Sequence, residues 1–154
     1  MPTTYTELRQ PGCVDAVLAR VARVTPTTSR QWGVMTSHEM LVHLADSFRA
    51  TLGMRKVSAV DTVFSRTVMK WGALRTPLAW PKGVPTRPEV DPKREGTKPE
   101  EFEADRDALV TLLRQFVDPA AVHTPHPFFG AMSEQEWMIW GYRHMDHHLR
   151  QFGV

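Results

Sequence analysis

Residues 133–152 read SEQEWMIWGYRHMDHHLRQF, and this stretch decides the fold because its apolar residues recur at helical spacing. Ser133, followed three residues later by Glu136, forms a capping-box pattern, in which each side chain bonds the backbone N–H of the other residue at a helix start. We therefore predict a long helix over residues 133–152.

Two histidines lie on the apolar face of this predicted helix. His144 and His148 are one turn apart, roughly 40° from each other around the helix axis, on the same side as Trp137 and Trp140. The i, i+4 spacing is the one by which a helix offers two nitrogens to one metal ion. The residues of this helix alone leave two interpretations open: a pair of metal ligands, or two core histidines that bond to backbone carbonyls.

Four further segments have apolar residues at spacings of three and four and are predicted to be helices: 12–24, 37–52, 59–74 and 99–116. Thr36 with Glu39 and Thr97 with Glu100 repeat the capping-box pattern. The residues expected to face inward in the third segment are Val60, Val63, Phe64, Val68, Trp71 and Leu74. No stretch shows the alternation of a strand, so we predict an all-α fold with helices long enough for a four-helix bundle.

A third histidine lies on the predicted helix 37–52. His43 shares a face with Met40, Leu44 and Ser47, whereas His38 points about 140° away, which excludes a metalloprotease-like pair. Together with His144 and His148, His43 gives a three-histidine set from two helices. Three protein ligands leave a coordination position open, which is typical of catalytic sites, and Zn, Ni and Fe all accept imidazole.

Four other residues are candidates for roles near this site. Asp46 follows His43 by about one turn and would orient a ligand imidazole or act as a base, or else pair with an arginine. His126, between two prolines before the last helix, is a candidate ligand, general base or loop anchor, and the anchor is the favoured role. Trp137 and Trp140 would form an aromatic wall for a substrate or cofactor.

Two stretches beside these candidates also carry predictions. The loop 76–99 contains six prolines between Pro77 and Pro99 and is expected to be a lid or functional flap. Arg150 and Gln151, which follow the histidines, are expected on a solvated face or an interface.

The totals set limits on the class of protein. The 154 residues fit a single domain over 1–154, and the net charge of +2, with interspersed signs, does not favour nucleic acid as a partner. One cysteine excludes an internal disulfide, and the sequence lacks a signal peptide and a membrane-length apolar run. These features predict a cytoplasmic protein that does not associate with a membrane.

Three motifs make the sequence similar to a known group. Trp32–Thr36 reads W-G-x-M-T, His126–Gly130 reads H-P-F-F-G, and His144–Gln151 reads H-x-x-H-H-x-R-Q. Together with His43 in LVHLADS, they resemble the DinB/YfiT-like superfamily and, within it, the uncharacterised DUF1569 family; residues 55–100 carry none of the resemblance. The resemblance implies a DinB-like four-helix bundle with long connecting loops, metal ligation by the three histidines already selected, and a homodimer.

The superfamily resemblance also suggests a reaction. It implies a metal-dependent enzyme that uses a low-molecular-weight thiol to attack a small electrophile, with Zn, Ni or Fe as the metal. Two alternatives remain open at this point: a metal-dependent hydrolase in which Asp46 or His126 serves as base, and a non-catalytic metal-binding or stress protein.

Overall fold

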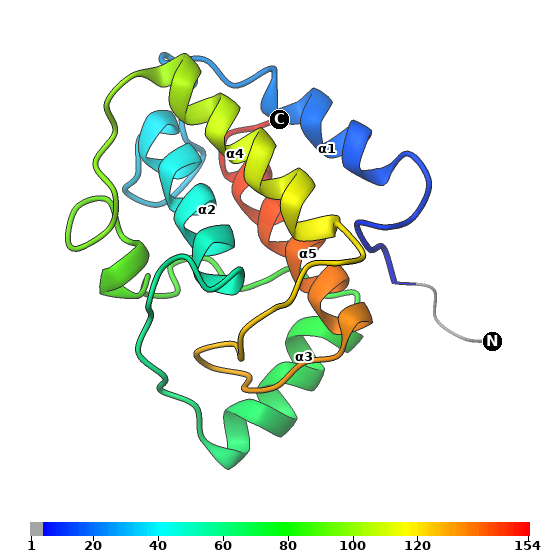
Figure 1. Cartoon of the computed structure of the whole chain (residues 1–154). Coiled ribbons are helices and arrows are strands. Elements are labelled where there is room, and N and C mark those ends of the chain that lie inside the picture. Colours follow the sequence, from blue (N-terminus) through cyan, green and yellow to red (C-terminus); the bar gives the residue numbers. More distant parts are fainter. Residues whose placement is uncertain (1–4) are drawn as a thin grey trace.

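The computed structural model describes residues 5–154, and the regular structure in this part of the chain is helical (Figure 1). The α-helices are α1 (Cys13–Val21), α2 (Ser37–Thr51), α3 (Lys70–Arg75), α4 (Phe102–Val117) and α5 (Glu134–Gln151), with a π-helical turn η1 (Ser65–Met69) and a 3-10 turn η2 (Pro88–Val90). Residues 5–154 contain no strand beyond an isolated bridge between His126 and Gly130. The predicted all-α class is confirmed. The first four residues of the predicted domain lie outside the described range.

Two of the three predicted capping boxes are present. Thr36 with Glu39 begins α2, and Ser133 with Glu136 begins α5, each with both reciprocal hydrogen bonds. The box predicted at Thr97 and Glu100 is wrong. Glu101 caps α4 instead, accepting hydrogen bonds from the backbone N–H groups of residues 103 and 104, and the helix therefore starts at residue 102 rather than 99.

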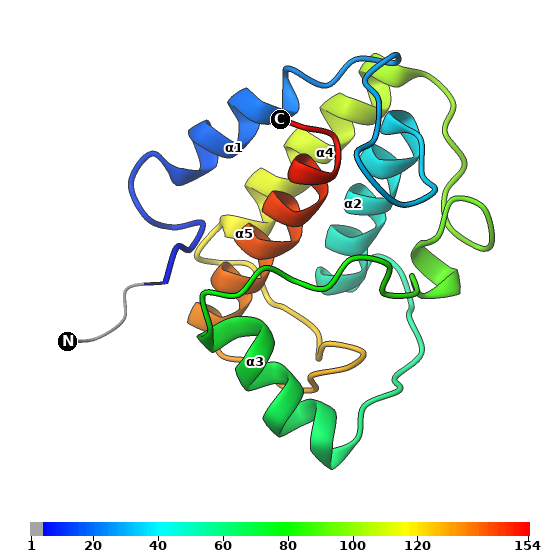
Figure 2. The same ribbon diagram turned by 180° about the vertical axis from the view of Figure 1, so that it is seen from behind.

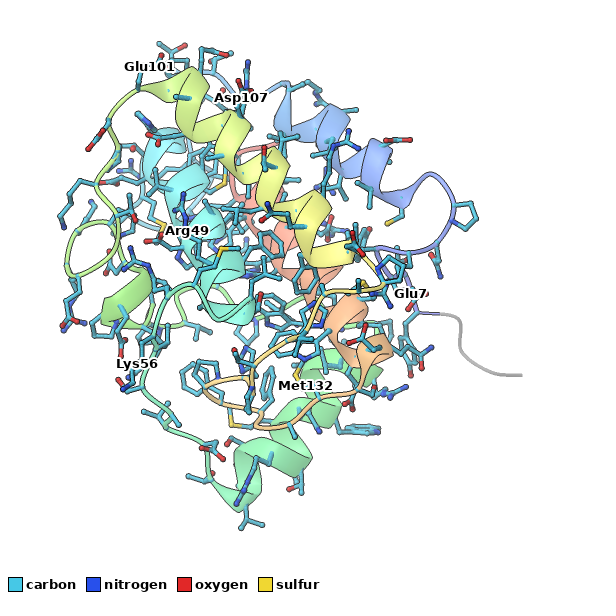
Figure 3. The ribbon with its side chains drawn as sticks, viewed as in Figure 1. Glu7, Arg49, Lys56, Glu101, Asp107 and Met132 are labelled. Atoms are coloured by element: carbon cyan, nitrogen blue, oxygen red, sulfur yellow. The ribbon has the colours of Figure 1, made fainter. Side chains whose placement is uncertain are left out.

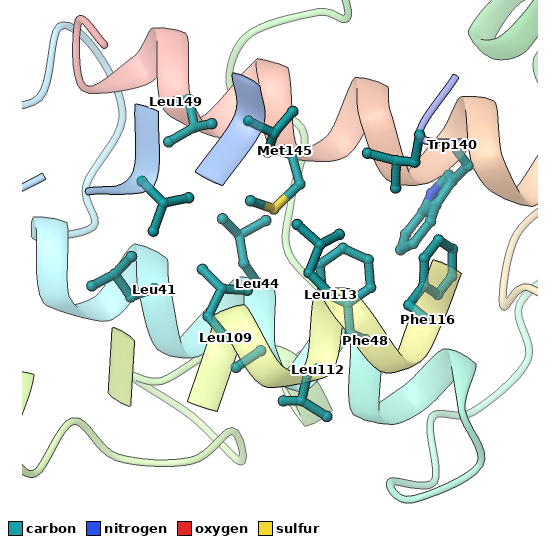
Figure 4. Packing of buried hydrophobic residues seen from close by; sticks show 14 of the residues in the cluster. Leu41, Leu44, Phe48, Leu109, Leu112, Leu113, Phe116, Trp140, Met145 and Leu149 are labelled. Atoms are coloured by element: carbon teal, nitrogen blue, oxygen red, sulfur yellow. The ribbon is translucent and has the colours of Figure 1, made fainter. Parts of the chain in front are cut away.

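The core lies where α2, α4 and α5 meet (Figure 4). Leu44 and Phe48 from α2 point toward Leu113 of α4 and Met145 of α5, and all four are fully buried. The outer faces of the same helices carry charged side chains, such as Arg49 on α2 and Asp107 on α4 (Figure 3). On α4 this separation of faces follows the 3.6-residue periodicity, whereas residues 40–48 of α2 are buried all round the helix.

The inward set predicted for residues 59–74 is wrong except for Leu74. Leu74 is fully buried, whereas Val63, Phe64, Val68 and Trp71 are 56–72% exposed. A π-helical turn, η1, interrupts the helix and shifts its side-chain register, and only the end of the helix packs on α5. The remainder projects away from the other helices (Figure 1) and contacts the loop before α5, where the Ser65 hydroxyl donates to the Phe128 carbonyl, while its apolar stripe stays exposed.

The proline-rich segment between α3 and α4 crosses the outside of α5 and reaches α2 (Figure 2). Arg143 on α5 holds its start by donating hydrogen bonds to the carbonyls of Thr76 and Leu78. Arg55, after α2, holds its middle through the Glu89 carbonyl, at 2.9 Å, and Asp46 on α2 accepts a hydrogen bond from Thr97 N–H near its end, at 2.7 Å. The segment is therefore tied to both histidine-bearing helices. Of the helices described in residues 5–154, none has the length and apolar character to cross a membrane.

Candidate metal centre

The three predicted ligands meet between α2 and α5. His43 comes from the middle of α2, and His144 and His148 from the last two turns of α5. Their ring centroids lie 4.8–5.3 Å apart, and His43 Nε2 lies 3.3 Å from His144 Nε2. One nitrogen from each ring lies within 4.8 Å of the others, which is a group that could hold a metal ion.

Hydrogen bonds on the outer side of the cluster fix two of the rings. His43 Nδ1 lies 2.8 Å from the Val90 carbonyl, and His148 Nδ1 lies 2.8 Å from Gln151 Oε1. Both partners are acceptors, so each Nδ1 carries the proton and each Nε2 offers a lone pair to the centre. The buried Nδ1 of His144 has no hydrogen-bond partner among the described residues.

Burial keeps the three imidazoles neutral. Desolvation lowers the pKa of His43, with the Val90 hydrogen bond opposing it. The pKa values of His144 and His148 fall well below the ordinary value, first because of burial and then because protonated neighbouring imidazoles would repel each other. Neutral imidazole is the form that binds metal, so the cluster does not have to lose protons at neutral pH before it can act as a ligand set.

One pair of ligand nitrogens has the spacing expected for a first-row metal ion with imidazole ligands. Two ligands on a tetrahedral ion with bonds of about 2.0–2.1 Å lie roughly 3.3 Å apart, the separation of His43 Nε2 and His144 Nε2. In the absence of a metal ion, Nε2 of His43 can only accept a hydrogen bond. His144 must therefore carry its single proton on Nε2 in order to donate that hydrogen bond. The buried Nδ1 of His144 has no partner among the described residues in either state: it is an unpaired acceptor without the ion and an unpaired N–H donor when Nε2 binds the ion.

Aromatic residues surround the cluster on two sides. Trp140 lies one turn before His144, and its ring centroid is 4.9 Å from the imidazole. Trp80, from the segment that crosses α5, lies 6.0 Å from His144 and 6.1 Å from His147. Trp137 lies behind Trp140 in the core and is 2% exposed. Of the two predicted wall residues, Trp140 is the one beside the histidines.

Asp46 lies close to His43 in sequence but bonds to other groups. Its side chain is fully buried and accepts hydrogen bonds from Arg49 at 2.8 Å and from the backbone N–H and hydroxyl of Thr97 at 2.7 and 2.8 Å. Arg55 forms a further ion pair with it, at 3.3 Å. Both carboxylate oxygens are thus engaged, and the Val90 carbonyl holds the imidazole that Asp46 was predicted to orient.

His126 anchors the loop before α5. Its Nδ1 accepts hydrogen bonds from the backbone N–H groups of Phe128 and Phe129, at 3.1 and 3.2 Å, and its ring stacks on Phe129 at 4.5 Å. The neutral ring therefore carries its proton on Nε2. Burial lowers the pKa of His126 to about 3, so it remains neutral over the physiological range. These contacts fit the anchoring role that the sequence favoured.

Three residues near the cluster were missed or misplaced by the sequence analysis. Gln151 was expected on a solvated face or interface, and that prediction is wrong, because the side chain is 5% exposed and bonds to His148. Trp32 and Trp80 were not proposed as site residues, and both lie beside His147. The tryptophan of the W-G-x-M-T motif was the available signal, whereas Trp80 lies in a loop without periodicity.

The fold and the site define an all-helical protein with a buried three-histidine group able to hold a metal ion. The chain belongs to the family described as protein of unknown function DUF1569, whose model matches residues 6–153. Neither a curated protein nor a solved structure matches the chain.

Proposed function

We propose that His43, His144 and His148 hold a divalent metal ion and that the protein is a metal-dependent enzyme acting on a small molecule. The convergence of three neutral imidazoles from two helices supports this proposal, because two of them already present unprotonated Nε2 atoms. Three protein ligands leave a position for water or substrate, as catalytic sites do. Zinc, nickel and iron all suit such a ligand set.

Within this class we favour transfer of a low-molecular-weight thiol to a small electrophile over hydrolysis. A metal ion in the site would lower the pKa of a thiol or water in its open position. A hydrolase would in addition use a side chain as general base, and both predicted bases bind other groups. The oxygens of Asp46 bond to arginines and Thr97, and Nδ1 of His126 bonds to backbone N–H groups. This observation favours thiol transfer, which depends less on such a base than hydrolysis does.

Two aromatic side chains would position the electrophile. Trp140 lies against His144 from within α5, and Trp80 approaches the same imidazole from the crossing segment. Trp80 donates a hydrogen bond from Nε1 to the Ala73 carbonyl at 2.9 Å, so its ring is held in place. We propose that the crossing segment acts as the lid predicted for residues 76–99 and excludes water from the site. We further propose that the family belongs to the DinB/YfiT-like superfamily, whose thiol chemistry the sequence motifs suggested.

Cobalt substitution tests the proposed function directly. The protein is stripped with a chelator, reloaded with Co²⁺, and titrated with glutathione, cysteine and a cysteinyl pseudodisaccharide such as mycothiol. We expect one of these thiols to produce a thiolate-to-cobalt charge-transfer band and then to react with a chromogenic electrophile such as 1-chloro-2,4-dinitrobenzene.

The matched control for this titration is an alcohol analogue of each thiol, which should leave the spectrum unchanged. A spectrum that no thiol alters, together with ester hydrolysis by the loaded protein, would replace thiol transfer with hydrolysis. Loss of the fold on metal removal, with neither activity, would support the non-catalytic alternative.

We also propose that a second copy of this chain covers the exposed apolar stripe that runs from Val60 into α3. The stripe consists of Val60, Val63, Phe64, Val68 and Trp71, which are 40–72% exposed. Exposed apolar side chains gathered in one patch mark interaction surfaces, and each partner in a standard interface contributes about 800 Å².

Replacing two residues of this stripe tests the dimer. Sedimentation equilibrium is expected to give a dimer for the wild-type chain and a monomer for the Val68→Asp and Trp71→Asp variants, because a carboxylate in the interface would be buried without a partner. Val122 is the matched control, since it is 82% exposed and lies outside the stripe, so Val122→Asp should remain dimeric. A wild-type chain that is monomeric at every concentration would contradict the proposal.

A further inference from the structure

His148 is held by hydrogen bonds that lead to the loop before α2. We propose that Gln151 is a positioning residue for His148, and that the turn at Trp32 and Gly33 in turn fixes Gln151. This inference rests on the proposed metal site, because its consequence is the affinity of that site for metal. Trp32, Gly33 and Gln151 belong to the sequence motifs, but the motifs alone do not show what these residues do.

Every polar group of the Gln151 side chain is engaged. Its Nε2 donates to the Trp32 carbonyl at 3.0 Å, and its Oε1 lies 2.8 Å from His148 Nδ1. The Trp32 carbonyl can only accept, which fixes the orientation of the amide and directs Oε1 at the imidazole. The backbone carbonyl of Gln151 also accepts from Gln31 N–H at 2.6 Å. The end of α5 and the loop before α2 are thus joined at this side chain.

Gly33 makes the close approach possible. Its φ of +79° lies in the left-handed region, and a Cβ atom at this position would lie 2.4 Å from Gln151 Nε2. A side chain there would have to displace the amide that holds His148. The glycine of the W-G-x-M-T motif is therefore explained by contact with Gln151.

The three ligands differ in how they are held. A backbone carbonyl, Val90, fixes His43, and His144 has no partner for Nδ1 among the described residues. The orientation of His148 depends on the side chain of Gln151. A substitution of Gln151 can therefore remove this hydrogen bond without changing the ligand itself. Outer hydrogen bonds to a ligand imidazole fix its tautomer and raise its basicity, and their loss typically weakens metal binding 10–100-fold.

Metal affinity of two isosteric variants tests the inference. Competition with a chromogenic chelator should show Zn²⁺ binding that is about 10–100-fold weaker in Gln151→Met than in wild type. Gln135 lies exposed on the same helix, so Gln135→Met is the matched control and should bind as wild type does. Unchanged affinity in a folded Gln151→Met variant would overturn the inference.

The coupling between the loop and Gln151 has its own test. Gly33→Ala should weaken Zn²⁺ binding to a similar degree, and the double variant with Gln151→Met should bind no more weakly than either single variant. Two losses that add in full would show that Gly33 does not act through Gln151. If Gly33→Ala does not fold, the Gln151→Met comparison still decides the role of Gln151.

A readout that needs no metal separates this inference from the proposed function. Nitrogen-15 NMR of the metal-free wild-type protein should show His148 as the Nδ1–H tautomer, and Gln151→Met should shift it toward a mixture of tautomers. Absence of metal binding in the wild type would defeat the proposed function and leave this tautomer result standing. An Nε2–H tautomer in the wild type would overturn the positioning role.

Discussion

The His43→Ala and His148→Ala variants are expected to lose the metal that the wild-type protein binds. Each substitution removes one of three imidazole ligands, so the affinity should fall by more than the roughly 10–100-fold that follows removal of an outer hydrogen bond. Elemental analysis after reloading with Zn, Ni or Fe should give about one metal per wild-type chain and almost none in either variant.

His147 provides the control for this experiment. It follows His144 on α5 and stacks edge-on against His148, but it lies outside the group whose nitrogens converge. The His147→Ala variant should therefore keep its metal. Thermal unfolding offers a second readout, because a metal at 100 times its dissociation constant stabilises the native state by about 2.7 kcal/mol. Wild type and His147→Ala should gain stability on metal addition, and the two ligand variants should not.

Two outcomes would contradict the metal centre. A folded wild-type protein that takes up no metal under any loading condition would make the three histidines core residues. Loss of metal from His147→Ala as large as that from His148→Ala would show that binding does not use the geometry described above. Either result would also remove the basis of the proposed enzyme.

The Asp46→Asn variant is expected to unfold more easily, by about 3 kcal/mol, while keeping its metal. The carboxylate is fully buried and pairs with Arg49 and Arg55, and removal of one partner from a buried ion pair typically costs 3–5 kcal/mol. Both arginines are partly exposed, so water compensates some of this loss. Urea denaturation of the metal-free protein measures the free energy of unfolding.

A surface carboxylate serves as the matched control for Asp46. Asp107 lies exposed on α4 (Figure 3), and Asp107→Asn should change the free energy of unfolding by no more than about 0.5 kcal/mol. The zinc affinity of folded Asp46→Asn should equal that of wild type, because the Val90 carbonyl rather than Asp46 orients His43. A stable Asp46→Asn variant with reduced turnover would instead identify Asp46 as the base predicted from the sequence.

The helical class and the three-histidine group could be predicted from the sequence because both depend on local periodicity. The spacing of His144 and His148 places them on one face of a helix in any fold that keeps the helix. His43 was selected because it shares the face of Met40 and Leu44, and both are fully buried in the structure. Capping boxes located the starts of α2 and α5 because they are contacts between residues three apart.

The sequence failed where the outcome depended on distant parts of the chain. The apolar stripe from Val63 to Trp71 has the periodicity of a buried face, but its large side chains are 56–72% exposed. Thr97 carries the signal of a helix cap, yet it bonds to Asp46, which is 51 residues away. Periodicity gives the direction of a side chain from its own helix and says nothing about which element lies opposite.

By itself, the sequence determined where the long helices lie and which three histidines can face one another. Only the tertiary structure decided what holds these histidines: the Val90 carbonyl for His43 and the Gln151 amide for His148. Val90 is 47 residues from His43, and Trp32, which orients Gln151, is 119 residues from it. Such contacts depend on where loops without periodicity cross the helices, and this placement is set by packing of the whole chain rather than by local spacing.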